Sequence, residues 1–125
     1  MIYVTDITNN NVTVINGEND SIITTITTGI ESSPIRVGVN TSTNTVYITN
    51  FFSNSVSIIR ASTNTVIDTV AVGANPRGIG VNSDTNTIYV GNFEDNTISV
   101  IDGITNTVID TIPLSISPYD IDVNY

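Results

Sequence analysis

Residues 45–50 read Thr-Val-Tyr-Ile-Thr-Asn, and residues 87–92, which begin 42 positions later, read Thr-Ile-Tyr-Val-Gly-Asn. A related run, Ile-Tyr-Val-Thr-Asp, precedes both at residues 2–6. These runs are rich in valine, isoleucine, threonine and tyrosine, which suit a pleated and packed surface. Self-similarity at a fixed spacing is typical of repeat proteins, so one period of about 42 residues is the unit that decides the fold.

Each period contains three further short runs of the same kind. One run occurs at 54–60 and 96–102, with a weaker first copy at 11–16. The next occurs at 63–70 and 105–112, with a weaker first copy at 21–26. The last occurs at 34–40, 76–82 and 118–124. Several are separated by Thr-Asn-Thr, whose asparagine tolerates the left-handed backbone of tight turns, at Asn44, Asn64, Asn86 and Asn106. No apolar stripe has helical spacing, so the chain is predicted to be all-β. Four short strands in about 42 residues predict one blade of a β-propeller.

We expect residues 1–125 to form a single unit of three four-stranded blades. The first blade supplies only its second to fourth strands, at 1–28, and the other two blades span 34–72 and 76–114. Residues 118–124 repeat the innermost strand of a blade but have no blade of their own. The first blade therefore lacks an inner strand, and the last residues supply one.

Three blades do not close a ring, because propellers have about four to eight. Such a unit would expose two apolar blade faces and unpaired strand edges. We therefore expect the last strand of one chain to complete the first blade of a second copy by strand exchange, as a six-bladed homodimeric ring or as an open, filament-like array. The residues expected to make this contact are Pro118, Tyr119, Ile121, Val123, Ile2, Tyr3 and Val4. A fragment of a longer propeller remains the alternative.

The composition limits the partners and the location. Twelve acidic residues against three basic ones give a net charge of −9, so the chain has no basic patch for nucleic acid or for an anionic membrane surface. Membrane insertion is not expected, because no apolar run reaches spanning length. Threonine, asparagine and serine supply a polar surface with few charges, which suits an extracellular or cell-surface protein. Strand-forming sequence begins directly after Met1, so we expect no signal peptide in this chain.

The sequence lacks several residue types that enzymes commonly use for catalysis. It contains no histidine, cysteine or lysine, which removes three common general bases or nucleophiles and any serine–histidine–aspartate arrangement. We expect no catalytic residue and no enzyme, although a carboxylate-dependent hydrolase remains open because function lies in loops grafted on a fold. No cofactor is expected apart from Ca²⁺, for which Asp120 and Asp122 are candidate ligands on one face of the last strand. Solvated acids are the preferred interpretation of this pair.

Loop residues suggest contacts with partners. Phe51, Phe52 and Phe93 form either a contact patch for a protein or glycan or, in the preferred interpretation, caps over the interface between blades. Sequons for N-glycosylation, which act as acceptors only in an exported chain, occur at Asn11, Asn19 and Asn40.

Two sets of residues have a structural interpretation. Tyrosines recur at one position of the blade and are predicted to be packing residues: Tyr3, Tyr47 and Tyr89. Gly78 and Gly80 begin the inner strand of the third blade, where small residues let neighbouring backbones approach near the propeller axis.

The tetrapeptides at 47–50 and 89–92, with the runs 96–102 and 105–112, resemble the YVTN repeat family of surface-layer and secreted propeller proteins. The resemblance covers nearly the whole chain, with departures at Asp6 and Arg60. It implies a propeller fold, usually of about seven blades in one chain, and no shared catalytic residue. We therefore expect a non-enzymatic extracellular structural or adhesion module that associates with itself. A small-ligand, sugar or Ca²⁺-binding propeller, with its site in the central channel or on the loop face, is the alternative.

Overall fold

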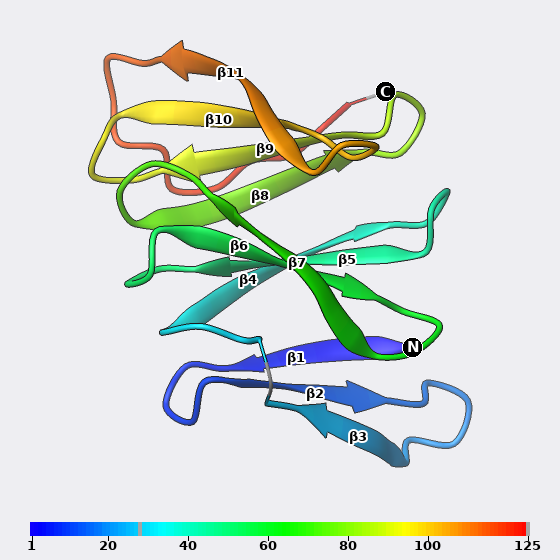
Figure 1. Cartoon of the computed structure of the whole chain (residues 1–125). Helices are drawn as coiled ribbons and strands as arrows, with labels where there is room; N and C mark the ends of the chain where they lie inside the picture. The colour runs from blue at the N-terminus through cyan, green and yellow to red at the C-terminus, as the bar shows by residue number, and fades with distance from the viewer. Residues whose placement is uncertain (28, 125) are drawn as a thin grey trace.

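A computed structural model describes residues 1–27 and 29–124 of the chain (Figure 1). Eleven strands in antiparallel ladders form three sheets that are stacked one on another. Sheet 1 contains β1 (Ile2–Asp6), β2 (Asn11–Ile15) and β3 (Ile22–Ile26); sheet 2 contains β4 (Pro34–Asn40), β5 (Thr45–Asn50), β6 (Ser55–Arg60) and β7 (Thr65–Ala71); sheet 3 contains β8 (Pro76–Asn82), β9 (Thr87–Asn92), β10 (Thr97–Asp102) and β11 (Thr107–Pro113). Thr28 and Tyr125, which end two predicted ranges, lie outside the described residues. The prediction of an all-β chain is confirmed.

The sheets repeat one another in register. Strands that follow one another in the sequence are neighbours in each sheet, so every sheet is an antiparallel meander. The pairs Tyr3–Val14, Tyr47–Ile58 and Tyr89–Val100 lie directly opposite each other in their ladders. We call residues at the same ladder position of two sheets equivalent. The sequence repeat is therefore also a repeat of strand register.

Asparagine turns separate the strands, as predicted. The four asparagines of the Thr-Asn-Thr turns have φ of 55°, 51°, 53° and 54° at Asn44, Asn64, Asn86 and Asn106. Further asparagines, which the sequence analysis did not single out, have φ of 53°, 51° and 52° at Asn10, Asn54 and Asn96. Asparagine is one of the few residues other than glycine that tolerates this left-handed conformation. These seven hairpin turns thus contain asparagine at the left-handed position, and the turn between β2 and β3 contains Asp20 with φ of 59°.

Two hydrophobic cores lie between the sheets. The core between sheets 1 and 2 contains Val12, Val14, Ile26, Ile30, Val46, Ile48, Ile59 and Ala61. The core between sheets 2 and 3 contains Tyr47, Val56, Ile58, Val70, Ile79, Ile88, Val90 and Ile101. Sheet 2 is therefore buried on both faces, because alternate residues of a strand point to opposite faces. Tyr47 is fully buried and Tyr3 packs against the first core, so both are packing residues as predicted.

The first strands of sheets 2 and 3 approach each other closely, and glycine permits this. A Cβ on Gly38 would lie 2.9 Å from Cγ2 of Val81. A Cβ on Gly78 would lie 2.6 Å from the Cα of Asp120, and one on Gly80 would lie 2.7 Å from Cγ2 of Ile121. The predicted close approach of two backbones is confirmed at Gly78, whereas Gly80 makes room for the side chains of Ile121 and Val123.

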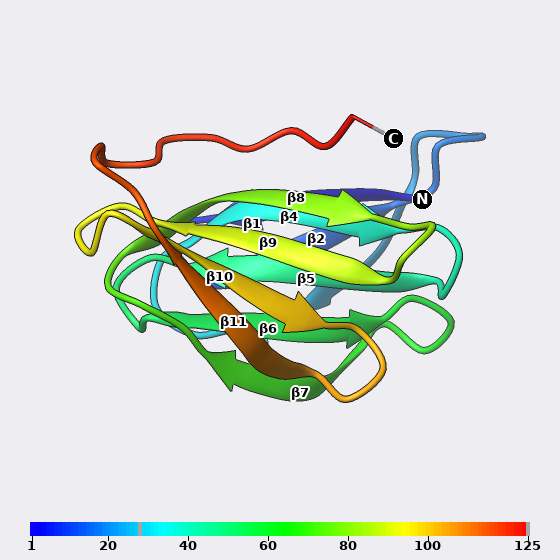
Figure 2. The ribbon, with the colours of Figure 1, turned by 90° about the horizontal axis from the view of Figure 1, so that it is seen from above.

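Residues 118–124 continue this row of first strands but are not a strand in the single chain. Pro118 is buried, and Ile121 and Val123 pack on Gly80. The segment runs extended beside β8 and separate from the ladder of sheet 3 (Figure 2). The predicted inner strand is therefore absent here for a physical reason: a strand needs a ladder partner, and this segment packs against the face of β8 instead of pairing with an edge.

The hydroxyl of Tyr47 is buried and, among the described residues, has no hydrogen-bond partner. An unsatisfied buried hydroxyl costs about 1–3 kcal/mol, so we expect Tyr47→Phe to stabilise the fold by about 1 kcal/mol at pH 7. Burial also raises the pKa of Tyr47 above its ordinary value of 10.0. The folded state then holds the phenolic proton longer than the unfolded state, so stability is retained below pH 10 and falls as the pH rises further.

Urea unfolding at pH 7 and above pH 10 measures both effects. Tyr47→Phe should raise the free energy of unfolding and reduce its loss at alkaline pH. Tyr119→Phe, at a position 58% exposed, is the matched control and should change neither. A Tyr47→Phe protein that is less stable than the parent at pH 7 would show that the hydroxyl has a partner.

Candidate functional site

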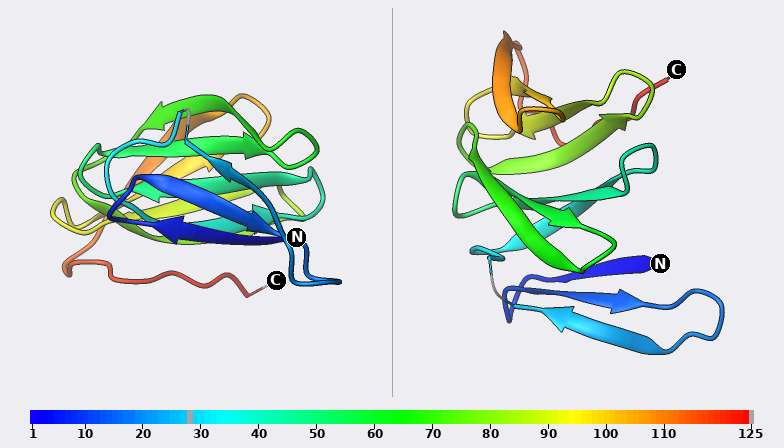
Figure 3. Two further views of the ribbon diagram at one scale, coloured as in Figure 1. Left: turned by 90° about the horizontal axis from the view of Figure 1, so that it is seen from below. Right: turned by 45° about the vertical axis from the view of Figure 1, so that its right-hand side comes forward.

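Sheet 1 leaves an apolar face uncovered at one end of the stack. Val46 and Ile48 of sheet 2 are fully buried against sheet 1. Their equivalents in sheet 1, Ile2 and Val4, are 47% and 46% exposed, because no further sheet covers them. We call Ile2, Val4 and Ile15 the first end face. Sheet 1, which carries these residues, lies at the bottom of the stack in the right-hand view of Figure 3.

Sheet 3 leaves the opposite kind of face only partly covered at the other end, where Val100 is 7% exposed. Sheet 2 covers sheet 3 with Tyr47, Val56, Ile58 and Val70, and their equivalents in sheet 3 are Tyr89, Ile98, Val100 and Ile112. We call this second set the second end face. Ile112 is 38% exposed, whereas Val70 is 7% exposed. The second end face is therefore equivalent to the face of sheet 2 that packs on sheet 3. The first end face is equivalent to the face of sheet 2 that packs on sheet 1.

A hollow of about 440 Å³ lies beside β1, where sheet 1 lacks a first strand. It is lined by Met1, Tyr3, Val39, Asn44, Val46 and Ala61. Val39 is 45% exposed there, although its equivalent Val81 is half-buried. The structure thus brings the predicted contact residue Tyr3 to the hollow, and Ile2 and Val4 to the face beside it.

The predicted contact residues of the terminal segment lie at the other end of the stack, against sheet 3. Ile121 and Val123 line a hollow of about 370 Å³ with Tyr89 and Ile98 of the second end face. Tyr119 is 58% exposed and lies over the guanidinium of Arg77, whose Cζ is 3.8 Å from the ring centroid. The two halves of the predicted contact are therefore far apart in one chain.

The three phenylalanines do not form one cluster. Phe93 meets the ring of Tyr119 edge-on with 6.3 Å between centroids. Phe51 meets Phe52 in the same way at 5.1 Å, and Phe52 is 69% exposed. A contact patch or a cap at these residues stays a prediction.

Asp120 and Asp122 are exposed, and each carboxylate accepts a hydrogen bond from the next backbone amide. The Oδ1–N distances are 3.0 Å to Ile121 and 2.9 Å to Val123. Residues 1–27 and 29–124 contain no group of three acidic, histidine or cysteine side chains placed to hold a metal ion. Calcium at Asp120 and Asp122 stays a prediction without a third ligand.

The three sequons differ in exposure. Asn19 is exposed and Asn11 is half-buried. Asn40 is fully buried, and its Nδ2 donates to Oδ1 of Asn86 at 2.7 Å. Glycosylation at Asn40 would require the folded packing between sheets 2 and 3 to open.

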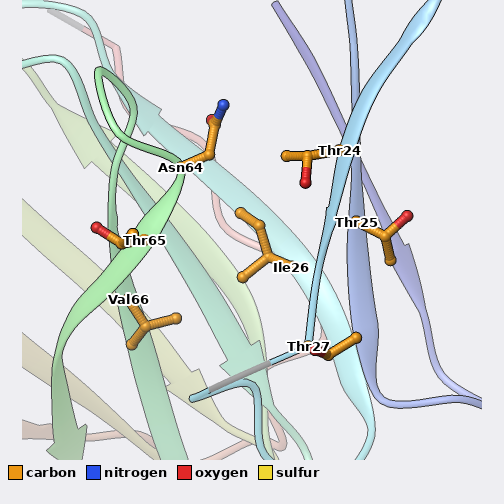
Figure 4. A pocket seen from close by; sticks show the side chains of 7 residues that line it. All are labelled: Thr24, Thr25, Ile26, Thr27, Asn64, Thr65 and Val66. Atoms are coloured by element: carbon orange, nitrogen blue, oxygen red, sulfur yellow. The ribbon is translucent and has the colours of Figure 1, made fainter.

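A groove of about 410 Å³ lies between β3 and β7 and is lined mostly by threonines (Figure 4). Asn64 lines it, and the Oδ1 of this side chain is buried without a partner in the described part of the chain. The equivalent Asn106 has the same unpartnered oxygen. The oxygen is therefore a property of this turn and does not indicate a ligand.

The sequence analysis missed a buried polar network in sheet 2. Asn50 donates from Nδ2 to Ser55 and Ser57, at 3.1 and 2.8 Å, and the two hydroxyls donate onward to the carboxylate of Glu31 and the carbonyl of Gly29. The available signal was the asparagine that ends Tyr-Ile-Thr-Asn, followed by alternating hydroxyl residues in the next strand.

An acidic turn in sheet 1 is electrostatically distinct. The pKa of Asp6 lies below its ordinary value, chiefly because the side-chain amide of Asn9 donates to it at 2.8 Å. Backbone amides of Asn9 and Thr8 add to this effect. These bonds fix the turn between β1 and β2 and form no catalytic arrangement.

The described residues contain no helix long and apolar enough to cross a membrane.

No family model and no curated protein matches the chain. Solved structures match its fold. Hydrazine synthase of Kuenenia stuttgartiensis is similar with a TM-score of 0.87 and 23% identity, over 94% of this chain and 34% of that one. AztD of Citrobacter koseri is similar with a TM-score of 0.76 and 18% identity, over 90% and 32%. U3-55K is similar with a TM-score of 0.87 and 12% identity, over 97% and 38%.

The chain spans about a third of the length of these proteins, which match it over 34%, 32% and 38% of their own lengths. Identities this low show the fold alone. The fold is all-β and propeller-like.

Proposed function

We propose that this chain is a self-associating β-propeller module without catalytic activity of its own. Three blades of one copy would join three blades of a second copy into a six-bladed ring. The observation that supports this most strongly is the match between the two end faces. The first end face exposes Ile2 and Val4 at 47% and 46%, where the equivalent residues of sheets 2 and 3 are fully buried by a neighbouring sheet. Burial of such apolar surface is the main favourable term in association.

Strand pairing supports the same placement as face packing. In sheet 2, Val39 of the first strand pairs with Val46 of the second. By equivalence, Val123 of one copy would pair with Ile2 of the second copy. This placement also lays the first end face of the second copy on Tyr89 of the first copy. One docking movement would therefore complete a ladder and cover both faces.

A polar contact repeats in the same placement. Between sheets 2 and 3, Asn40 donates to Asn86 at 2.7 Å. The equivalent residues across the proposed contact are Asn124 of one copy and Asn44 of the second copy. Asn44 lines the hollow beside β1 that the terminal segment would fill.

The two terminal aspartates would meet the second copy differently. Asp120 is equivalent to Gly78, and the proposed contact would place it beside Arg36 of the second copy, where opposite charges attract. Asp122 is equivalent to Gly80, at which a Cβ lies 2.7 Å from the next segment. Asp122 would therefore bring both a crowded side chain and a carboxylate to the closed interface.

We accordingly expect Asp122→Gly to strengthen self-association. Removing a crowded carboxylate from an apolar contact should lower the dissociation constant by about tenfold or more, since about 1.4 kcal/mol gives a factor of ten. Dilution series in the analytical ultracentrifuge measure the change. Asp84→Gly, in an exposed turn of sheet 3, removes the same charge and should leave the dissociation constant unchanged. Weaker association of Asp122→Gly would contradict the proposed packing of the terminal segment.

A disulfide test examines the pairing residue by residue, because the chain contains no cysteine. Facing residues of an antiparallel ladder have Cα atoms about 4.5–5.5 Å apart, within the range that a disulfide spans. The double variant Ile2→Cys and Val123→Cys should form disulfides between chains on mild oxidation. The double variant Ile2→Cys and Ile109→Cys is the control and should not. A bond within one chain, or none, would count against the exchange.

The proposal includes an extracellular or cell-surface location. It rests on the polar surface with only 12% charged residues and on the resemblance to YVTN repeats. Cleavage of the protein by protease added to intact cells tests the location. Protection until the cells are lysed would contradict it.

Further blades of a longer polypeptide are the other way to cover both end faces. The lengths of the structural neighbours favour this alternative, because the chain matches about a third of each. The 125-residue chain on its own distinguishes the two. It associates under the present proposal and stays single if only additional blades fit its ends.

A further inference from the structure

A second hollow, of about 440 Å³, lies between sheets 2 and 3 and is independent of the end faces. Its lining includes Gly73 from the segment between β7 and β8, and Asn92, Asp95, Thr97 and Ser99 from sheet 3. Asn92 is fully buried and Ser99 is 3% exposed. Buried polar side chains at the floor of a hollow of this size call for hydrogen-bond partners.

The floor of the hollow repeats the buried network of sheet 2. Asn92 donates from Nδ2 to Thr97 at 3.1 Å and to Ser99 at 2.8 Å. Its Oδ1 accepts from the backbone amide of Gly73 at 3.1 Å. The asparagine and the two hydroxyl residues thus have the same arrangement in both sheets.

The two networks differ in what accepts the hydroxyl protons. In sheet 2, Ser55 donates to Glu31 at 2.7 Å and Ser57 donates to the carbonyl of Gly29 at 2.9 Å. In sheet 3, neither Thr97 nor Ser99 has an acceptor for its own hydroxyl proton among residues 1–27 and 29–124.

The connecting segments explain this difference. The segment between β7 and β8, residues 72–75, is shorter than residues 27–33 between β3 and β4. Gly73 stands three residues before Pro76, as Glu31 stands three residues before Pro34. The segment between β7 and β8 therefore brings no counterpart of Glu31 to the hydroxyls of Thr97 and Ser99. The carboxylate of Asp95 lies beside Gly73 but accepts no hydrogen bond from either hydroxyl in the described residues.

We propose that this hollow binds a neutral polyhydroxylated ligand of the monosaccharide class. One ligand oxygen would accept from the hydroxyl of Thr97, in the place that the Glu31 carboxylate occupies in the other interface. A second would accept from the hydroxyl of Ser99, in the place of the Gly29 carbonyl. The carboxylate of Asp95, whose Oδ2 accepts from the backbone amide of Ala74 at 2.8 Å, lines the same hollow and accepts from a ligand hydroxyl. A sugar hydroxyl both donates and accepts hydrogen bonds, which suits a site that contains two hydroxyl donors and one carboxylate acceptor.

Charge and size select this class of ligand. An anionic ligand would meet the carboxylate of Asp95 in a chain of net charge −9. Small-molecule sites occupy about 300–1,000 Å³, and this hollow falls in that range. All of its residues belong to one chain, so the site does not depend on self-association.

The test is a titration of the isotope-labelled chain with D-glucose, D-galactose and N-acetyl-D-glucosamine, followed by NMR. The expected result is saturable shifts of the backbone amides of Gly73, Asp95 and Ser99 with at least one sugar. Ser99→Ala should then weaken the affinity by about tenfold, which is the effect of one lost hydrogen bond. Ser57→Ala is the matched control, because its hydroxyl donates to Gly29 and not to the hollow.

Asp95→Ala, at an exposed position, provides a second variant that does not disturb the buried network and should also weaken binding. Three results would overturn the proposal. They are no saturable shift with any of the three sugars, equal losses for Ser99→Ala and Ser57→Ala, and a crystal soaked in sugar that shows only ordered water in the hollow.

Discussion

Val4→Arg should convert the associated protein into single chains. Val4 is 46% exposed in the single chain, whereas its equivalents Ile48 and Val90 are fully buried by a neighbouring sheet. In the proposed ring it lies against the second end face of another copy. An arginine there would place an unpaired charge in an apolar contact, which costs several kcal/mol. We expect the dissociation constant to rise by about a hundredfold or more.

The control for this variant is Ile109→Arg. Ile109 is 60% exposed on β11, and its equivalent Ile67 stays 41% exposed although sheet 3 is in place. Packing of another sheet therefore does not bury this position, and the charge should be tolerated. Size-exclusion chromatography with light scattering measures both variants. If Val4→Arg and the parent have equal molar masses in solution, the first end face does not take part in self-association.

Gly38→Val should be the most destabilising single change at the row of first strands. A Cβ at this position lies 2.9 Å from Cγ2 of Val81 and 3.3 Å from Cγ1 of Ile79. The facing strand is held by its own ladder, so the crowding cannot relax by rotation of one side chain. Overpacking of this kind costs about 1–3 kcal/mol, and we expect the upper end of that range.

Gly17→Ala is the matched control for Gly38→Val. A Cβ on Gly17 meets only the side chain of Ile2, at 3.6 Å, which is an ordinary contact. Its free energy of unfolding should change by less than about 0.5 kcal/mol. Both variants are measured by urea unfolding at fixed protein concentration, because self-association would add to the apparent stability. A Gly38→Val protein as stable as the parent would show that the row of first strands is loosely packed.

Much of the fold follows from the repeat in the sequence. The recurring runs predicted strands whose structural bounds agree within a few residues, as for β5 at Thr45–Asn50 and β9 at Thr87–Asn92. The Thr-Asn-Thr turns were predicted because asparagine tolerates positive φ, and the structure has φ of 51–55° at all four. Local chemistry determines these features, so one sequence suffices to predict them.

Features that depend on contacts between repeats were predicted less well. Residues 118–124 match the other first strands in sequence, but a strand also requires a partner, and the single chain offers none. The network of Asn50 and the open hollow at Asn92 differ through Glu31 and Gly73, which lie in segments of different length outside the repeated runs. The periodicity of the sequence does not predict which hydrogen-bond acceptor in a loop lies beside a buried hydroxyl.

The proposed calcium site shows the same limit. Two aspartates two residues apart predict a shared face of a strand, but a Ca²⁺ site needs several oxygen ligands from converging segments. In the part of the chain that the structure describes, Asp120 and Asp122 are joined by no third acidic ligand.

The molar mass of the 125-residue chain in solution tests self-association most directly. Sedimentation equilibrium over a wide range of concentrations gives this mass without reference to shape. The closed ring predicts a species of twice the 13.3 kDa chain mass that gains no further copies as the concentration rises. A mass of 13.3 kDa at every concentration would contradict the account, because Ile2 and Val4 of the first end face and Ile112 of the second would then remain exposed to water.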